Sequence, residues 1–421
     1  MEYEGEGQPN ELALSLPNEL ALSLLNVPAL SLSNRGCVYS RIKARISVIY
    51  EYILVSMSDV NHETNADITP GMFSPKPAEV GWRAEPGRTV LVTGATGLLG
   101  TNLVRRLTEK GVSVRALARS KEKAAKQFGS LLIEIVVGDI NDPKSFADRL
   151  SGLDMVFHTA AYFRDNYKGG KHWDQLYQTN VVGTAKLLEI CYAAGVRRFV
   201  HISSTATLRG QPGELTDETM WRREAEADDY QRSKILSDQE VYKFLKSHPD
   251  FWAAFVLPGW MHGPGDSGPT SAGQTVLDFL HRKLPGVPPG SFSVVDVRDV
   301  ADAAIRAAET GKRAERYLAA GRAVTMAELF TELEQVSGIK APRNKVPMAA
   351  LYLIGAISEL RARITRQPAL ISWATVQLLV KEADRQHFDH SKSERELAIR
   401  FREIQETLRD AIGWFKANGY A

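Results

Sequence analysis

The sequence predicts an α/β protein with a doubly wound parallel sheet and a smaller, mostly helical C-terminal lobe. Two observations support this prediction. From Arg88 onward, short apolar runs alternate with helical patterns, which indicates a parallel sheet covered by helices on both faces. The first run ends in a glycine-rich turn, TGATGLLG at 93–100, that opens a predicted helix. A turn of this composition in this position is typical of a Rossmann-type domain.

Each strand is predicted from a run that is short and dense in apolar, often β-branched, residues. Six strands are expected, over 88–94, 112–118, 132–139, 153–160, 197–204 and 252–259. Beyond about residue 260 the pattern becomes irregular and then mostly helical, as at 326–338 and 403–419, where a glycine ends each helix. We therefore expect a dinucleotide-binding domain over 88–260. A substrate lobe is expected over 261–421, with some elements returning to the sheet.

Residues 1–87 differ in texture from the rest of the chain. PNELALSL occurs at 9–16 and again at 17–24, and LNVPALSL at 25–32 resembles it. An eight-residue repeat fits no usual solenoid period, and the acidic opening MEYEGEG lacks the basic region of a secretion signal. We expect this leader to be disordered, or to be an over-extended start with Met57 or Met72 as the true beginning.

Composition excludes several function classes. Fifty-two basic and 50 acidic residues leave a net charge of +2, so no bulk field favours nucleic acid. Cys37 and Cys191 are the two cysteines; they form no disulfide framework or metal-ligand spacing, which fits a reducing cytoplasm. The apolar run at 348–357 is too short for an integral span. It is expected to be an amphipathic or core helix, with weak interfacial attachment as the alternative.

The glycine turn predicts a dinucleotide site. Gly94 permits the tight turn, Gly97 lets the backbone approach a pyrophosphate, and Gly100 lets helix and strand pack closely. The N-terminus of the following helix offers free N–H groups and a positive dipole end to the phosphates. The expected cofactor contacts here are Gly94, Thr96, Gly97, Leu98, Leu99 and Gly100.

The end of the second strand favours NADP(H) over NAD(H). NAD sites usually place a carboxylate about 20 residues after the glycines, on the ribose 2′-hydroxyl. That place here is Ala118, followed by Arg119, and Arg115 lies earlier in the strand. A guanidinium suits a 2′-phosphate better than a hydroxyl. The alternative is that Arg119 is only a loop cation.

The stretch ADDYQRSKILSD at 227–238 contains a candidate acid–base pair. Tyr230 and Lys234 stand four residues apart and share one helix face. A lysine on a stripe that faces the core is costly unless it has polar partners, and a nearby ammonium favours the phenolate form of a tyrosine. Asp228 and Asp229 are expected to cap this helix. His158 and His201 end apolar strands and are expected to be core histidines, with no metal site around them.

Several motifs stand in an order that identifies a family resemblance. They are TGATGLLG, VVGDI (136–140), HTAA (158–161), NVVGT (180–184), HISS (201–204), YQRSK (230–234), GPGD (263–266) and VVDVRDVA (294–301). From about 88 to 415 the chain resembles the extended short-chain dehydrogenase/reductases, the NAD-dependent epimerase/dehydratase family. Within that family it is most similar to dihydroflavonol-reductase-like and hopanoid-associated sugar epimerase-like proteins.

The resemblance implies roles for individual residues. Ser204 matches the catalytic serine, Tyr230 the general acid/base, Lys234 its partner, and Asn180 a residue that holds the active-site helix and a proton-relay water. The further cofactor contacts that it implies are Asp139 and Ile140 beside the adenine, Ala160 and Ala161 along the dinucleotide, and Pro258. The substrate-side residues that it implies are Tyr162, Trp260 and His262. It also implies a homodimer formed through helices that flank the sheet.

The stretch LPGWMHGPGD at 257–266 departs from the family pattern. Leu257 stands where the family often has arginine, and His262 stands where an aromatic residue is usual. Both positions lie where substrate is expected, so they put a nucleotide-sugar substrate in doubt. The sequence leaves open whether the chain is a reductase, an epimerase or a dehydratase. A non-catalytic dinucleotide sensor or scaffold is the alternative from another class.

Overall fold

Seven parallel strands form the main sheet of the computed structural model, which describes residues 81–163, 172–365, 376, 382 and 384–421. Their order is β3-β2-β1-β4-β5-β6-β9. The strands are β1 (Thr89–Thr93), β2 (Ser113–Ala118), β3 (Glu134–Val137), β4 (Met155–His158), β5 (Arg198–Ile202), β6 (Trp252–Pro258) and β9 (Arg316–Ala319). All six strands expected from the sequence are present. The doubly wound parallel sheet is therefore confirmed.

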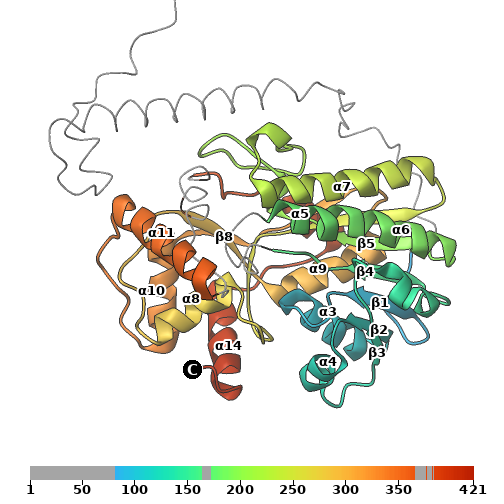
Figure 1. Cartoon of the computed structure of the whole chain (residues 1–421), viewed down its shortest axis with the longest axis horizontal. Helices are drawn as coiled ribbons and strands as arrows, with labels where there is room; N and C mark the ends of the chain where they lie inside the picture. The colour runs from blue at the N-terminus through green and yellow to red at the C-terminus, as the bar shows by residue number, and fades with distance from the viewer. Residues whose placement is uncertain (1–80, 164–171, 366–375, 377–381, 383) are drawn as a thin grey trace, which may run out of the picture. The chain divides into compact units, whose positions relative to one another are not determined.

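Helices cover both faces of this sheet, as Figure 1 shows for α6 and α7 on one side and α3 and α9 on the other. Successive side chains of β1 alternate between the two layers. Val90 and Val92 pack with α3 and α9, whereas Leu91 packs with α6 and α7. Because side chains of a strand point alternately to opposite faces, a strand buried on both sides must be apolar throughout. This explains the continuous apolar runs.

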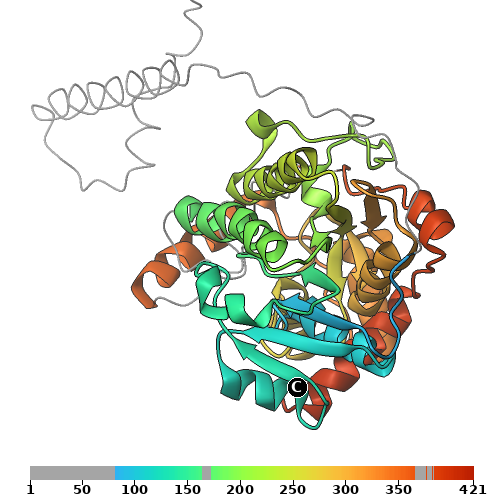
Figure 2. The same cartoon turned by 90° about the vertical axis from the view of Figure 1, so that its right-hand side faces the viewer.

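The helices of the main layers are α3 (Leu98–Glu109), α4 (Lys121–Phe128), α5 (Trp173–Leu176), α6 (Gly183–Ala193), α7 (Asp229–Ser247), α9 (Val297–Thr310) and α13 (Ser391–Leu397). A π-helical turn, Tyr177–Val182, joins α5 to α6. In the described part of the chain, 3-10 segments lie at Pro143–Arg149, Thr205–Thr207 and Glu224–Glu226. Figures 1 and 2 both place α6 beside α7.

The C-terminal lobe contains a sheet that the sequence analysis did not foresee. It has the order β10-β8-β7 and consists of β7 (Trp260–His262), β8 (Ser291–Asp296) and β10 (Arg322–Thr325). Around it lie α8 (Ser271–Leu280), α10 (Met326–Ser337), α11 (Met348–Thr365) and α14 (Ile404–Ala417). The lobe has a hydrophobic core of its own, which includes Leu329, Phe330, Leu408 and Phe415.

Local signals mark both ends of α10. Thr325 and Glu328 form a capping box at the start of α10, and Gly338 ends that helix in the left-handed conformation at φ 73°. A residue without a Cβ adopts this conformation without strain. The glycine stop predicted at 338 is therefore confirmed.

The packed body begins before Arg88, which corrects the expected end of the leader at residue 87. Trp82 is 4% exposed, and its ring meets Phe157 of β4 edge-on at 5.9 Å. Ala84 donates its backbone N–H to Glu309 of α9 at 3.2 Å. The leader predictions for residues 1–80 lie outside the described residues.

None of the described helices combines the length and the apolar character that crossing a bilayer would require.

Candidate active site and dinucleotide site

The glycine turn between β1 and α3 is shaped by two close backbone approaches. Gly94 has φ 62°, and a Cβ there would lie 2.8 Å from the backbone N and Cα of Ala160, at the end of β4. A Cβ on Gly100 would meet the carbonyl oxygen of Gly94. Both positions therefore require glycine, and Gly94 lets the turn lie against the carboxyl end of β4.

The N-terminus of α3 is left open to a ligand. Gly97 is the N-cap, no side chain caps the helix, and its first turn has no acidic residue. A Cβ on Gly97 would meet only the carbonyl oxygen of Gly94, at 3.3 Å. Thr96 is half-buried, while Leu98 and Leu99 are buried in the core. Uncapped N–H groups and the positive helix end suit a pyrophosphate, so these residues fit a dinucleotide cofactor.

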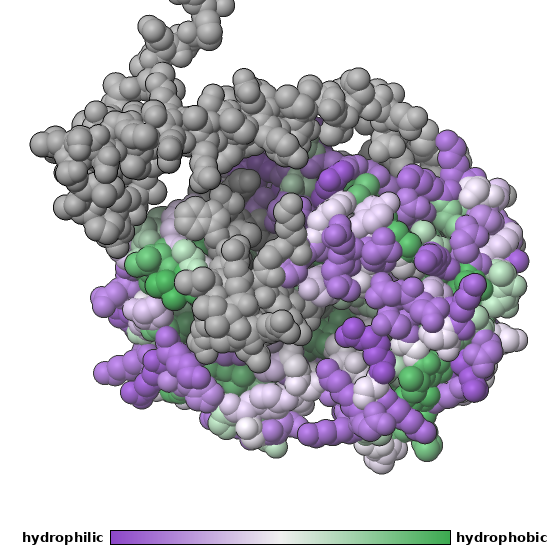
Figure 3. Space-filling model, in the orientation of Figure 1, coloured by the Kyte–Doolittle hydropathy of each residue, from purple (hydrophilic) through white to green (hydrophobic). Residues whose placement is uncertain are grey.

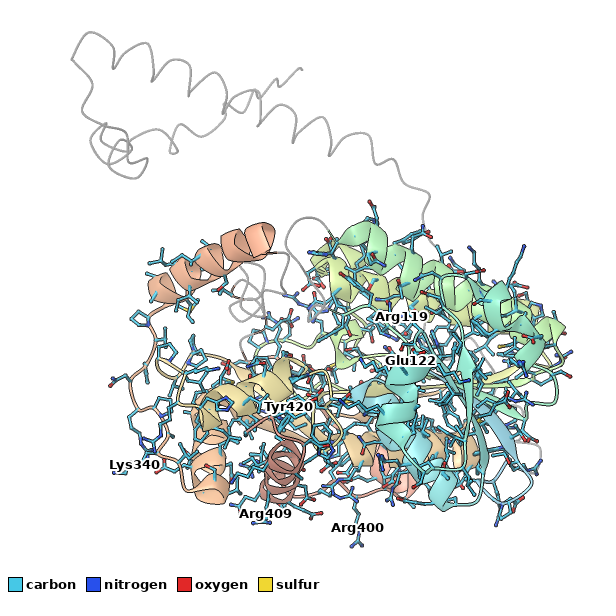
Figure 4. The ribbon with its side chains drawn as sticks, turned by 60° about the horizontal axis from the view of Figure 1, so that its bottom comes forward. Arg119, Glu122, Lys340, Arg400, Arg409 and Tyr420 are labelled. Carbon is cyan, nitrogen blue, oxygen red and sulfur yellow. The ribbon has the colours of Figure 1, made fainter. Side chains whose placement is uncertain are left out.

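Arg119 lies exposed at the turn between β2 and α4, as Figure 4 shows. No hydrogen bond or ion pair recorded for the described residues involves its side chain. Arg115 differs, because it bonds Glu134 at 3.1 Å and the carbonyl oxygens of Arg149 and Ser151. Arg115 is thus part of the fold, and Arg119 is the guanidinium that can meet a ligand.

A carboxylate that the sequence analysis passed over lies in the same turn. Glu122, in the first turn of α4, accepts a hydrogen bond from Ser120 at 2.9 Å. Ser120 also caps α4 by accepting from Lys123 N–H at 3.1 Å. The sequence places Glu122 only three residues after Arg119. Scanning the first helical turn for acids, as well as the strand end, would have found it.

The residues implied to flank the rest of the dinucleotide lie at neighbouring strand ends. Asp139 accepts from the N–H and the amide of Asn141 at 2.9 and 3.1 Å, and Ile140 is 8% exposed. Ala160 is half-buried and Ala161 is exposed, just after β4. Pro258 is buried at the end of β6. These strands are parallel, so their carboxyl ends share one edge of the sheet.

Tyr230 and Lys234 lie buried in the first turns of α7. A capping box of Asp228 and Gln231 starts the helix, which confirms the expected capping role of Asp228. Tyr230 is 7% exposed and Lys234 is 3% exposed. The Lys234 Nζ donates to the carbonyl oxygen of Ile202, at the end of β5, at 2.7 Å. Burial lowers the pKa of Lys234 to about 8, against the opposing effect of the Asp238 carboxylate.

Three consecutive residues at the end of β5 join this strand to the site. Ile202 accepts from Lys234, and the Ser203 hydroxyl donates to Asp238, one turn further along α7, at 2.7 Å. Ser204 is half-buried, and its Oγ accepts from Ala206 N–H at 3.1 Å. A hydroxyl that accepts still has one proton to donate. The end of β5 therefore holds α7 in place through Ile202 and Ser203. Ser204, with its hydroxyl, is the next residue in the chain.

Asn180 lies in the π-helical turn and ties a loop to α7. Its Oδ1 accepts from the N–H of Tyr162 at 2.7 Å, and its Nδ2 donates to the carbonyl of Tyr162 and to Ser233 Oγ, both at 3.0 Å. π-Helical turns are frequent at functional sites. Both polar atoms of the amide are thus engaged in holding the backbone of Tyr162 against α7.

His158 and His201 are buried beneath the site, as expected of core histidines. His158 bonds Thr93 at 2.8 Å and Thr184 at 3.0 Å, and His201 lies 3.2 Å from Asp238. Burial lowers the pKa of both histidines, and that of His158 falls well below its usual value. They are structural groups in a buried polar network, and the prediction is confirmed.

Asp238 and Arg316 are the members of this network that the sequence analysis missed. Arg316, in β9, contacts Thr207, lies 3.4 Å from Asp238 and covers the Trp221 ring at 3.8 Å. Burial opposes ionisation of Asp238, but the hydrogen bond with His201 and the charges of Arg316 and Lys234 leave its pKa lowered. An acidic residue four positions after a catalytic-type lysine was the available signal for Asp238. Nothing local indicated Arg316.

The implied substrate residues fall into two groups. Tyr162 lies 3.5 Å from His172 through its hydroxyl, and the next ring, Phe163, meets Tyr230 edge-on at 4.7 Å. Trp260 and His262 instead belong to the second sheet, where their rings meet at 4.6 Å. Among the described residues, no hydrogen bond or ring contact joins this second group to Tyr230. Phe163 is thus a site residue that the motifs did not reveal.

Leu257 and His262, the two departures from the family pattern, are both buried. Leu257 is fully enclosed, and His262 is 2% exposed. Neither ring nitrogen of His262 has a hydrogen-bond partner in the described part of the chain. Burial lowers its pKa to about 4. His262 is therefore neutral at physiological pH.

A cavity of about 600 Å³ lies between β8, the turn before β10 and the segment that leads into α14. Asp296, Arg322 and Arg402 line it, and none of the predicted catalytic or cofactor residues does. The site is therefore located by the converging strand ends and not by this cavity.

Comparison with known proteins agrees with this geometry. The model of the NAD dependent epimerase/dehydratase family matches residues 90–320. Sterol demethylase protein B of Methylococcus capsulatus is 34% identical over 79% of this chain and 99% of its own length. A putative dihydroflavonol 4-reductase of Synechocystis sp. is 32% identical over 78% of this chain and 95% of its own.

Among solved structures, gox2253 is 30% identical and superposes with a TM-score of 0.67, covering 79% of this chain and 99% of its own. The motif order, the fold and these relatives agree. The chain therefore belongs to the NAD dependent epimerase/dehydratase family of extended short-chain dehydrogenase/reductases and is an NAD(P)-dependent oxidoreductase.

Proposed function

We propose that the chain is an NADP(H)-dependent reductase or dehydrogenase that interconverts a carbonyl and a carbinol on a polycyclic substrate of low polarity, with Tyr230 as general acid/base. The observation that carries the proposal is the buried ammonium of Lys234, 3% exposed on the helix that holds Tyr230. Burying a charge is costly. If α7 only packed in the core, an apolar residue at position 234 would make the protein more stable.

In the reductive direction, the Tyr230 hydroxyl gives its proton to the substrate carbonyl oxygen. The Lys234 ammonium favours the phenolate that remains, and the Ser204 hydroxyl donates a hydrogen bond to the same oxygen and stabilises its developing charge. Asn180 holds the Tyr162 backbone against α7. When bound, the nicotinamide cofactor supplies or accepts the hydride.

The preference for NADP(H) rests on Arg119. The fold does not use its guanidinium, whereas Arg115 is held by three groups. A 2′-phosphate would pair with Arg119 and meet the N-terminus of α4. The Glu122 carboxylate lies in the same turn and would repel the negatively charged 2′-phosphate. We therefore infer a moderate preference, set by the balance of these two side chains.

The substrate class rests on the residues around Tyr230. The ring of Phe163 meets that of Tyr230 edge-on at 4.7 Å, and Leu257 stands where the family often has arginine. Aromatic side chains offer large apolar contact area. The names of the two relatives above refer to a sterol and to a dihydroflavonol, both of which are polycyclic. This favours such a molecule over a nucleotide sugar.

The test is NADPH oxidation by the purified full chain with a panel of polycyclic ketones and, separately, with nucleotide sugars. We expect turnover with at least one ketone and a loss of about 10²-fold or more in Tyr230→Phe. Binding of NADPH to that variant, measured by fluorescence, should remain. Turnover of nucleotide sugars alone would contradict the substrate class, and full turnover by Tyr230→Phe would contradict the role of Tyr230.

The non-catalytic sensor is distinguished by the same assay. A sensor needs the glycine turn but not the buried pair. If NADPH bound while every substrate in the panel, together with a broader metabolite pool, gave no product, the sensor reading would replace the proposal.

We also propose a homodimer formed through the helices that flank the sheet. Tyr177, beside α5, is 38% exposed, and its ring lies 5.6 Å from that of Trp173. Exposed aromatic side chains are enriched in interfaces between subunits. Analytical ultracentrifugation of the full chain tests the proposal: a single monomeric species at micromolar concentration would exclude it.

A further inference from the structure

The exposed face of the first part of α11, residues 348–358, is apolar. Its exposed side chains between residues 348 and 358 are Ala349, Leu353, Ala356 and Ile357. Leu353 is 62% exposed and Ile357 is 58% exposed, one helical turn apart. Residues spaced by three and four share one helix stripe. In Figure 3, a green patch lies where Figure 1 places α11, with purple residues beside it. Such a patch on a monomer marks an interaction surface.

The loop that leads into α11 is basic. Lys340, Arg343 and Lys345 are all exposed there, and Figure 4 shows Lys340 projecting from the outer side of the lobe. Among the described residues, neither Lys340 nor Lys345 takes part in an ion pair. Arg343 pairs with Glu334 at 2.9 Å but keeps 72% of its side chain exposed. The loop thus presents cations at the outer surface of the lobe.

Two further features reinforce this charge. The first turn of α11 has no acidic residue, so the positive end of the helix dipole adds to the cations of the loop. A backbone bridge between Val287 and Lys345 also pins the loop to the segment that follows α8. That segment carries Arg282 and Lys283, both exposed.

We propose that the exposed apolar face of α11 and the basic loop before it form a docking surface for an anionic lipid bilayer. The apolar side chains would enter the boundary between headgroups and acyl chains, while the lysines and arginine face the lipid phosphates. No described helix can cross a membrane, so the contact is interfacial and reversible. This docking surface does not depend on which substrate the active site binds.

Charge decides between a bilayer and a second copy of the chain. A two-fold interface uses the same patch on both subunits. Residues 339–358, which comprise the basic loop and the first part of α11, contain no acidic residue, so a second copy of this patch would bring no carboxylate to the cations. An anionic surface instead complements both the apolar face and the cations around it.

The test is flotation of the full-length protein with vesicles of phosphatidylcholine alone, or with about one third phosphatidylglycerol, at low and high salt. We expect binding to the anionic vesicles that weakens at high salt. Leu353→Gln with Ile357→Gln should reduce the partition coefficient at least tenfold. Lys340→Gln with Lys345→Gln should reduce it about thirtyfold, or about fivefold for each cation.

Matched controls change the same residue types elsewhere. Leu132→Gln with Leu215→Gln removes two side chains that are 91% and 57% exposed, and Lys144→Gln with Lys246→Gln removes two exposed cations. Both controls should float like the wild type, and thermal unfolding should show that all variants are folded.

Three results would overturn the proposal. The first is no binding of the wild type to anionic vesicles. The second is equal loss in the controls and in the α11 variants. The third is that the Leu353 and Ile357 substitutions alter the oligomeric state in sedimentation while vesicle binding is unchanged, which would assign the face to a second copy.

Discussion

Lys234→Met is expected to abolish turnover while making the protein more stable near neutral pH. Burial lowers the pKa of Lys234 from its usual 10.5 to about 8. Each pKa unit corresponds to about 1.4 kcal/mol, so holding the ammonium in the core costs about 3 kcal/mol of folding free energy. The substitution removes this cost but leaves the carbonyl of Ile202 without its donor, which costs about 1 kcal/mol. The expected net gain at pH 7 is about 2 kcal/mol.

The gain should depend on pH in a defined direction. The folded-state pKa lies below the unfolded value, so below about pH 8 both states hold the proton and the full cost is present. Between about pH 8 and 10.5 only the unfolded chain binds the proton, and the wild type therefore becomes more stable as pH rises. Near the upper end of this window the variant should have lost its advantage.

Urea unfolding at pH 7 and near pH 10 measures both effects, and NADPH oxidation measures the loss of turnover. Lys246→Met is the matched control, because Lys246 lies on the same helix but is exposed. Its difference from the wild type should be small and independent of pH. If Lys234→Met were no more stable than the wild type at pH 7, and its difference did not change with pH, the cost assigned to the buried ammonium would be wrong.

Three further predictions follow from the same structure. Asp238→Asn removes the carboxylate that raises the pKa of Lys234, so the basic limb of the kcat profile should move to lower pH; an unmoved limb with lower stability would leave Asp238 a purely structural role. Arg119→Ala should weaken NADPH binding by about 10- to 100-fold in a fluorescence titration and leave NADH nearly unchanged, whereas equal losses for both would refute recognition of the 2′-phosphate. Trp82→Ala should reduce the free energy of unfolding by about 3 kcal/mol, since the ring is 4% exposed in the core; a change below about 0.5 kcal/mol in urea unfolding would return residues 81–87 to the leader.

The sequence alone determined the main sheet, the glycine turn and the helix face that Tyr230 and Lys234 share, because all three rest on local patterns. A strand buried on both faces must be apolar along its length, so six of the seven strands could be read from composition. A turn that approaches another backbone closely requires glycine, and a spacing of four places Tyr230 and Lys234 on one helix face. The short strand β9 and the sheet of the lobe were not predicted, because these strands mix polar and apolar residues and so lack a continuous apolar run.

Only the tertiary structure decided what holds the pair in place. Lys234 meets the carbonyl of Ile202, which is 32 positions away, and Asp238 meets Ser203 and Arg316 at separations of 35 and 78. The tertiary structure likewise showed that hydrogen bonds within the fold hold the Arg115 side chain but not that of Arg119, although both arginines lie near one strand end. A spacing along a helix says which side chains share a face. The element that covers that face, and with it the pKa of a buried lysine, depends on how distant segments pack.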